Sequence, residues 1–164
     1  MREADLKDFA AFLEEFQAET DRGAALVGAA LIDQKLKDTL AAFFAERRVG
    51  AELLDGGNAP LGTLSARIKA ALCLGLINRD EFHECDLIRK IRNEFAHRTH
   101  GTTFSDPVIA THCSKLRSDL PGGANAFRDN PRGVFINATI LTVLRLTYRS
   151  EYVAREKRVI RAWP

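Results

Sequence analysis

Residues 92–97, RNEFAH, combine three side chains that could act together on a phosphate ester. The guanidinium of Arg92 offers a planar fork of donors that matches phosphate oxygens. The imidazole of His97 titrates near neutral pH and could accept or donate a proton, and Asn93 could orient either group. If the segment is helical, Arg92 and His97 lie about 140° apart around the axis, so they bracket a polar face without stacking on each other.

The same polar face can be interpreted more simply as the solvated side of a helix. Arg89 lies on it and could also grip a phosphate, but Asp86 can pair with Arg89 or Lys90 and slightly stabilise the helix. His97 stands near the expected C-terminal end of the helix, where a cation interacts favourably with the helix dipole. Spacing alone leaves both interpretations open.

Two further polar clusters stand beside small or apolar residues. Asp21 and Arg22 fall in the stretch ETDRGAAL, and Arg67 falls in GGNAPLGTLSARI. Ion pairing would explain Arg22, and capping of a helix by Thr63 would explain most of the second cluster without a ligand. If the clusters instead form an internal polar site, we expect Arg22, Arg67 and Arg92 to be more buried than arginines usually are.

The elements that must position these side chains are helices, because apolar residues recur mostly at spacings of three and four. No segment alternates with period two for long enough to predict a strand. Helices are predicted over residues 4–18, 20–47, 62–74, 79–98, 106–118 and 132–160, the last broken near Ser150, with loops over 48–61 and 120–133. The sequence predicts an all-α fold, a single-domain helical bundle of five to seven helices over residues 1–164.

Composition and missing motifs exclude several protein classes. The chain has 164 residues, 46% hydrophobic and 28% charged, as is typical of one globular domain. No apolar run approaches the roughly 18 residues of a membrane span, and the charged N-terminus is unlike a secretory signal, so we expect a cytoplasmic protein. Glycine-rich phosphate loops and the HExxH motif are absent, and His83 and Cys85 lack further ligands nearby, so we expect no cofactor and no metal.

Charge is distributed unevenly along the chain. Residues 1–21 hold seven acidic residues against two bases, whereas residues 141–164 hold six bases against two acidic residues. Opposite charges at the two ends can serve internal packing, self-association or recruitment of an anionic partner. The net charge of +2 and the lack of a basic recognition helix do not indicate a DNA-binding protein.

Three stretches occur in order within residues 9–117, namely FLEEFQAETDRGAALVGAALID, LLDGGNAPLGTLSARIKAALCLGLI and DLIRKIRNEFAHRTHGTTFSDPVI. Together they resemble the mannitol operon repressor family of bacteria. The resemblance implies an all-helical cytoplasmic protein, often a homodimer, that represses transcription of sugar-alcohol genes and works through a protein partner. Within these stretches the candidate binding residues are Asp21, Arg22, Arg67 and Arg89.

RNEFAH also resembles the Arg-x4-6-His signature of the helical HEPN domains, the higher-eukaryote and prokaryote nucleotide-binding domains. That resemblance implies a metal-independent endoribonuclease in which Arg92 stabilises the phosphate, Asn93 assists and His97 is the general acid or base. An inactive relative that only binds RNA or a nucleotide is a further alternative. We favour the regulator over the enzyme, and the ribonuclease hypothesis requires Arg92 and His97 to face one shared cleft between two subunits.

Overall fold

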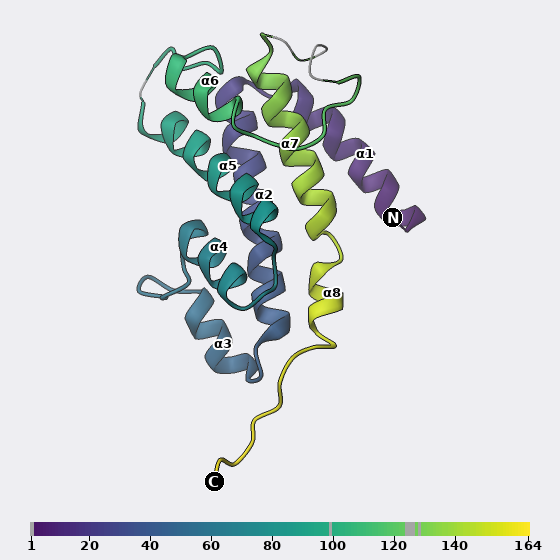
Figure 1. Ribbon diagram of the computed structural model, residues 1–164, viewed down its shortest axis with the longest axis vertical. Helices are drawn as coiled ribbons and strands as arrows, with labels where there is room; N and C mark the ends of the chain where they lie inside the picture. Colours follow the sequence, from purple (N-terminus) through teal and green to yellow (C-terminus); the bar gives the residue numbers. More distant parts are fainter. Residues whose placement is uncertain (1, 99, 124–126, 128) are drawn as a thin grey trace.

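The computed structural model describes residues 2–98, 100–123, 127 and 129–164, and all regular secondary structure in these ranges is helical. The helices are α1 (Glu3–Ala18), α2 (Asp21–Phe43), α3 (Arg47–Leu54), α4 (Leu64–Cys73), α5 (Arg79–His97), α6 (Pro107–Cys113), α7 (Pro131–Leu146) and α8 (Arg149–Val153). They pack into one bundle (Figure 1). The predicted all-α, single-domain bundle is therefore confirmed.

Helix α2 is the axis of the bundle, and α1, α3, α4, α5, α7 and α8 all pack against it (Figure 1). The first half of its buried side consists of small residues (Ala24, Ala25, Gly28 and Ala29), and the surroundings of Gly28 explain why a larger side chain would not fit. A Cβ atom at Gly28 would lie 2.9 Å from Cγ2 of Thr139 on α7 and 3.2 Å from the ring of Phe16 on α1. The missing side chain therefore lets three helices approach closely.

An aromatic cluster fixes α5 beside α6 and α7. The ring centroids of Phe95 and Phe104 lie 4.9 Å apart, and those of Phe104 and Phe135 lie 5.0 Å apart. All three rings are buried, and such tilted arrangements are favoured between aromatic side chains. Because Phe95 is anchored inward, the opposite side of α5 faces outward and carries its polar residues.

Three predicted helix starts are confirmed by their capping bonds. The hydroxyls of Thr20 and Thr63 each accept a hydrogen bond from the backbone N–H three residues further on. Asn78 forms a reciprocal capping box with Glu81 at the start of α5. Each cap satisfies backbone donors that the first turn of a helix leaves without partners, and so fixes where α2, α4 and α5 begin.

Helix α3 lies where the sequence predicted a loop over 48–61, and α2 ends at Phe43 rather than near residue 47. The chain turns between them, and the Glu46 side chain caps α3 by accepting from the N–H of Val49. Gly50 packs directly on Phe44, where a Cβ atom would lie 2.6 Å from Cδ2 of the ring. Gly56, Gly57 and Asn58, residue types that favour a turn, come only after α3, so the predicted loop was too long.

The C-terminal helical segment is shorter than the predicted 132–160. It consists of α7 and α8, separated near the predicted break at Ser150, and helix ends at Val153. Residues 154–164 are not helical and lead away from the bundle (Figure 1). Val159, Ile160 and Trp163 are 67%, 74% and 84% exposed, because they lie on no other part of the described chain. The predicted helix 106–118 likewise ends early, at Cys113.

Candidate functional site

Arg67 forms the centre of a buried polar cluster between α2, α3 and α4. Its side chain is nearly enclosed, and its guanidinium donates to Oδ2 of Asp33 at 2.6 Å. The same group donates to the backbone carbonyls of Leu61 and Leu54, each at 2.9 Å. All of these acceptors are internal. The predicted binding residue Arg67 thus ties the loop before α4 to the end of α3 and to α2.

A polar pocket of about 400 Å³ lies beside this cluster, between the start of α4 and the outer side of α5. It brings together three of the predicted site residues, Arg89, Arg92 and Asn93. Its lining comprises Asp33, Gly62, Thr63, Leu64, Ser65, Arg89, Arg92 and Asn93. All three sequence stretches that resemble the mannitol operon repressor family contribute to this α4–α5 pocket.

The charges of the α4–α5 pocket are partly satisfied within the chain. Arg89 donates to Oδ1 of Asp86 through Nε at 3.0 Å and Nη2 at 2.7 Å. Burial pushes the pKa of Asp86 upward, but hydrogen bonds from Lys90 and Arg89 outweigh it and hold that pKa below its usual value. Half-buried Arg92 donates to Oδ1 of Asn93 at 3.0 Å.

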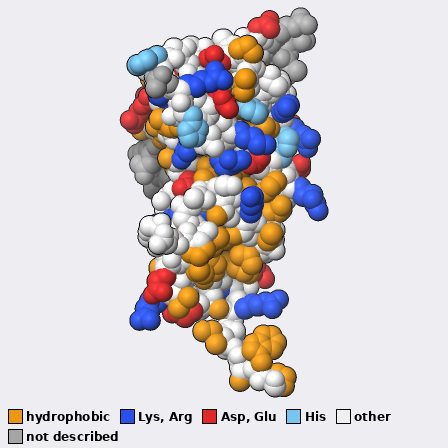
Figure 2. Space-filling view, turned by 90° about the vertical axis from the view of Figure 1, so that its left-hand side faces the viewer, with side chains coloured by type: hydrophobic (Ala, Val, Ile, Leu, Met, Phe, Trp, Pro, Cys, Tyr) orange, Lys and Arg blue, Asp and Glu red, His pale blue; other side chains and the backbone are white. Residues whose placement is uncertain are grey.

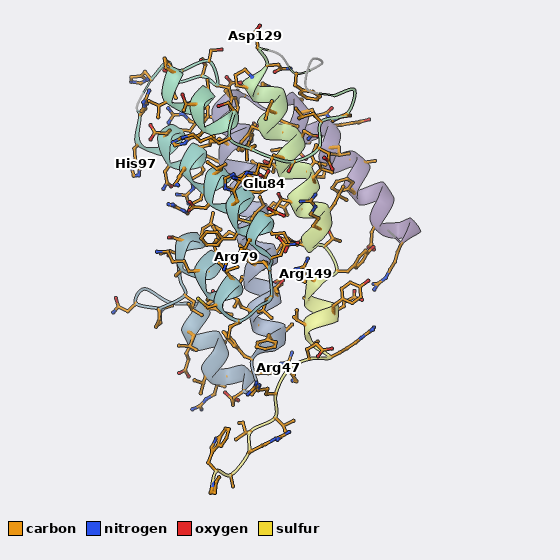
Figure 3. The ribbon with its side chains drawn as sticks, viewed as in Figure 1. Arg47, Arg79, Glu84, His97, Asp129 and Arg149 are labelled. Atoms are coloured by element: carbon orange, nitrogen blue, oxygen red, sulfur yellow. The ribbon has the colours of Figure 1, made fainter. Side chains whose placement is uncertain are left out.

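His97 lies outside the α4–α5 pocket. It is exposed at the C-terminal end of α5 and points away from the bundle (Figure 3). Arg92, in contrast, lines the pocket together with Arg89. The single chain therefore does not bring Arg92 and His97 to one site, and a shared cleft between two subunits stays a prediction.

Asp21 and Arg22 connect the start of α2 to the end of α5, to the loop before α6 and to the start of α7, and they do not line the α4–α5 pocket. The Arg22 guanidinium donates to the backbone carbonyl of Arg98 at 2.6 Å. Asp21 accepts from Nη1 of Arg132 at 3.1 Å and from the N–H of Phe104 at 3.0 Å. Arg22 is half-buried, as is Arg92, whereas Arg67 is only 6% exposed. The three arginines are thus partly or fully buried, and the contacts of Arg22 and Arg67 run to the chain itself.

Two buried carboxylates, not anticipated from the sequence, hold α5 in place. Glu81 pairs with Arg149 of α8, with Oε1 2.6 Å from Nη2. Glu84, seen at the centre of Figure 3, accepts from the N–H of Arg117 at 2.8 Å and from the hydroxyl of Ser118 at 2.7 Å. Both glutamates are at most 3% exposed, and they continue the stripe of Ile88, since residues 81, 84 and 88 share one helix face.

Histidine, lysine and arginine side chains gather in the upper half of the view in Figure 2, the part of the molecule where α5 and α6 lie in Figure 1. We define the α5–α6 cationic face by His83, Lys90, His112 and Lys115. Nε2 of His83 lies 2.9 Å from the carbonyl oxygen of Lys115, which links α5 to the residues after α6. Burial lowers the pKa of His112, and the nearby Lys115 and Lys90 lower it further. The side chains of Lys90, His112 and Lys115 therefore lie close enough together for their charges to interact.

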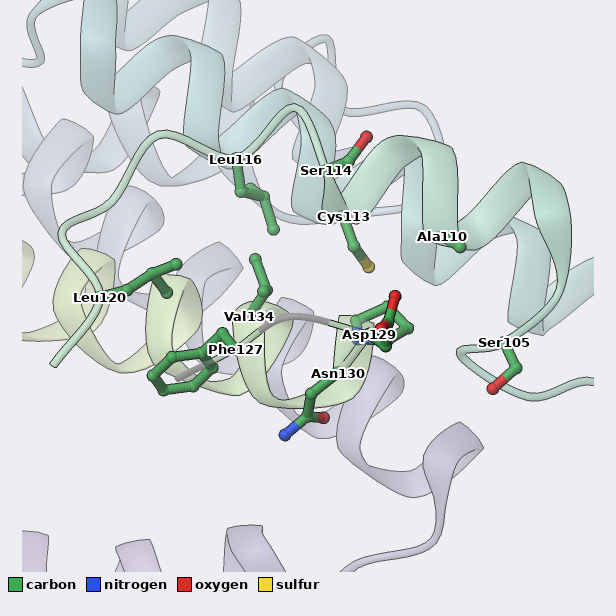
Figure 4. A pocket seen from close by; sticks show the side chains of 11 residues that line it. Ser105, Ala110, Cys113, Ser114, Leu116, Leu120, Phe127, Asp129, Asn130 and Val134 are labelled. Atoms are coloured by element: carbon green, nitrogen blue, oxygen red, sulfur yellow. The ribbon is translucent and has the colours of Figure 1, made fainter. Parts of the chain in front are cut away.

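A second, more apolar pocket of about 510 Å³ lies between α6 and the start of α7 (Figure 4). Cys113, Leu116 and Val134 line it together with the side chain of Asp129. Burial raises the pKa of the Cys113 thiol to about 12, so the group stays protonated and is a poor nucleophile. The described residues of the lining include no paired acid and base.

In the part of the chain that the structure describes, no helix is both long enough and apolar enough to cross a membrane. No group of three or more His, Cys, Asp or Glu side chains in the same residues is arranged to hold a metal ion.

Comparison with known proteins gives one family. A family model described as "Mannitol repressor" (MtlR) matches residues 12–125. The mannitol operon repressors of Escherichia coli K12 and of Escherichia coli O6:H1 (strain CFT073) are each 42% identical to this chain over 57 residues. These matches cover 35% of this chain and 29% of either relative, so they span less than a third of the curated proteins.

One solved structure shares the fold. A chain of the X-ray structure of the MtlR-HPr complex from Escherichia coli superposes with a TM-score of 0.55. The similarity covers 87% of this chain and 95% of that chain, at 24% sequence identity. At this identity the likeness extends to the fold.

Proposed function

This chain belongs to the mannitol repressor family, and from that premise we propose that it is a bacterial transcriptional regulator of sugar-alcohol genes that acts through a protein partner. The observation that carries the proposal is the family match over residues 12–125. That range includes α2, α4, α5 and α6 and both polar clusters described above. The proposal places the protein in the cytoplasm, where transcription occurs.

The partner that we propose is an HPr-type protein. The support is the fold shared with a chain of the MtlR-HPr complex from Escherichia coli. The chain's modest net charge of +2 and the absence of a basic recognition helix from the sequence also favour a protein contact over direct reading of DNA.

We further propose that two copies associate. The opposite charges of residues 1–21 and 141–164 favour contact between unlike ends of two chains. The exposed apolar side chains of Val159, Ile160 and Trp163 would lose contact with water in such a pair. Light scattering of the purified protein measures the mass, and a monomer at micromolar concentration would contradict this part of the proposal.

A second candidate function is binding or cleavage of RNA in the manner of HEPN domains. The observation that favours it is the α4–α5 pocket, where Arg89, Arg92 and Asn93 surround one polar hollow. Against cleavage stands His97, which lies outside that hollow and faces solvent. We therefore rank the regulator first.

Deletion of the gene tests the regulator directly. We expect transcription of a sugar-alcohol operon to rise in the deletion strain and to return to its original level when the full chain is supplied again. We also expect HPr from the same bacterium to be retained on a column that carries the purified full chain. Unchanged transcription together with no retained HPr would contradict the proposed function.

A further inference from the structure

We propose that the α4–α5 pocket binds a small phosphorylated molecule, whose phosphate group is held by Arg92 and Arg89 and whose hydroxyls contact the other polar groups of the lining. The inference goes beyond the proposed function, since it concerns a small ligand rather than the protein partner. It also differs from the second candidate function, because the ligand is not RNA and is not cleaved.

The first support is the unbalanced charge of Arg92. Its guanidinium donates to the neutral amide oxygen of Asn93 at 3.0 Å, and no carboxylate pairs with it among the residues that the structure describes. A guanidinium has more N–H donors than this one bond uses, and their planar fork matches the oxygens of a phosphate. Half-buried Arg92 therefore presents a positive charge and unused donors to the pocket.

The second support is that the carboxylates around the pocket do not balance its cations. Arg89 and Lys90 share Asp86, at 2.7 and 2.9 Å, so one negative charge faces two positive charges. Asp33, a carboxylate in the lining, is matched by Arg67 at 2.6 Å. The pocket therefore has an excess of positive charge, which favours an anionic ligand over a neutral one.

The third support is the start of α4, which forms another wall of the pocket. Residues 62–65 line the pocket at the point where α4 begins, and the first turn of this helix holds no acidic residue. The first N–H groups of a helix have no partners within it, and the helix dipole places partial positive charge at that end. An anion between this helix start and the two arginines of α5 is therefore stabilised by both helices.

The size and polarity of the pocket indicate what else the ligand carries. A volume of about 400 Å³ lies within the range of small-molecule sites and exceeds what a bare phosphate ion fills. The hydroxyls of Thr63 and Ser65 and the amide of Asn93 line it, and such groups can both donate to and accept from the hydroxyls of a sugar or polyol. No aromatic side chain is among the described lining residues, so a nucleobase finds no stacking partner there.

The same geometry favours binding without cleavage. No histidine occurs among the described lining residues, and His97 lies outside the pocket. The carboxylate of Asp33 already accepts a hydrogen bond from Arg67. Arg67 also fixes the loop before α4 through the carbonyl of Leu61, so this wall is in position before a ligand arrives. A preformed site loses little conformational entropy when it binds its ligand.

The test measures the affinity of the purified full chain for inorganic phosphate, glucose 6-phosphate and glucose, by calorimetry at constant ionic strength. The variant Arg92→Gln removes one charge from the pocket, and Ser65→Leu fills part of the pocket without changing its charge. The control is Arg79→Gln, the same substitution at an exposed residue of α5 that does not line the pocket (Figure 3). Circular dichroism checks that each variant is folded.

We expect wild type to bind glucose 6-phosphate more tightly than inorganic phosphate and to show no binding of glucose. Arg92→Gln should weaken the binding of both phosphorylated probes roughly tenfold or more, because the charge-assisted bonds to the phosphate are lost. Ser65→Leu should weaken the binding of glucose 6-phosphate more than that of phosphate. The control Arg79→Gln should match wild type.

Four results would overturn the inference in whole or in part. No binding of either phosphorylated probe at millimolar concentration, or equal affinities of Arg92→Gln and Arg79→Gln, would overturn the site. Equal affinities of wild type for phosphate and glucose 6-phosphate would overturn the recognition of hydroxyls. Tighter binding of a short RNA than of glucose 6-phosphate, lost in Arg92→Gln, would overturn the choice of a small molecule. The proposed regulator is judged separately, by transcription in the deletion strain.

Discussion

Asp33 on α2 and Arg67 on α4 form a charge-assisted hydrogen bond of 2.6 Å beneath the α4–α5 pocket. The other oxygen of Asp33 is buried and has no hydrogen-bond partner in the described chain, although Asp33 itself lines the pocket. The guanidinium of Arg67 also donates hydrogen bonds to the backbone carbonyls of Leu61 and Leu54. This pair therefore holds the floor of the pocket, and removing either partner leaves a poorly hydrated charge behind.

We expect Arg67→Ala to lower the free energy of unfolding by about 3 kcal/mol, because Asp33 and the carbonyls of Leu54 and Leu61 lose their donor. Urea denaturation followed by circular dichroism measures the change. The control is Lys69→Ala on the exposed side of the same helix, which should shift the free energy by less than about 0.5 kcal/mol. Similar losses for both variants would show that the buried pair contributes little.

Gly28 gives a prediction about packing between α2 and α7. We expect Gly28→Ala to destabilise the protein by about 1–3 kcal/mol, because the new Cβ atom would meet Cγ2 of Thr139 at 2.9 Å. Thr139→Ala removes that methyl group, so the double variant should lose less than Gly28→Ala loses alone. A double-mutant cycle in urea measures the coupling. Strictly additive losses would place the clash elsewhere.

The regulator and the ribonuclease differ in what Arg92 and His97 do. If the proposed regulator is right, purified wild type, Arg92→Ala and His97→Ala should leave a labelled single-stranded RNA equally intact over hours without added metal. Gel electrophoresis of the RNA provides the measurement. Decay with wild type that is lost in both variants would instead favour the HEPN-type enzyme, with a cleft completed by a second subunit.

His112 should make stability depend on pH. Burial, Lys115 and Lys90 lower its pKa in the folded chain, so the unfolded chain takes up this proton at a higher pH than the folded chain does. The contribution of His112 to the free energy of unfolding is therefore lost as pH falls below the unfolded pKa of about 6.5.

We expect His112→Gln to flatten the decline of the free energy of unfolding between about pH 7 and pH 5. Urea denaturation at several pH values measures it. His100→Gln, at an exposed histidine, should keep the wild-type slope. If His112→Gln also keeps that slope, His112 does not cause the dependence.

The three cysteines should differ in reactivity. Burial raises the pKa of the Cys85 thiol to about 12, with Glu81 adding to the shift, and burial does the same for Cys113. Cys73 is exposed. A thiol reagent at about pH 8 should therefore modify one cysteine rapidly, and Cys73→Ser should abolish that phase. Rapid modification of Cys73→Ser would mean that the bundle opens locally.

The sequence predicted most of the helices, and the cap at Thr63, because both depend on nearby residues. Spacing of apolar side chains marks a helix, and Thr20, Thr63 and Asn78 act on N–H groups three residues away. Helix α3 was missed since its cap, Glu46, is an unusual choice and its buried Gly50 resembles a turn residue.

The site was harder to predict because its contacts join distant segments. Glu81 and Glu84 follow the buried stripe of α5, and that spacing could have marked them as buried, but their partners Arg149 and Ser118 lie at least 34 residues away. Arg92 and Asn93 do share a pocket with Arg89, as their common helix face allows. The internal bonds of Arg67 could not be predicted, since Leu54 and Leu61 become its neighbours only after the chain has folded, and its role in binding stays a prediction.

The central place of α2 limits how the molecule can respond to a bound partner. Helices from both ends of the described chain pack against it, so a large movement of either end would have to break contacts with α2. A partner that binds the outer surface of the bundle would therefore contact helices that are already packed against α2. If the proposed regulator is right, we therefore expect it to act by covering a surface of its partner rather than by a large movement of its own helices.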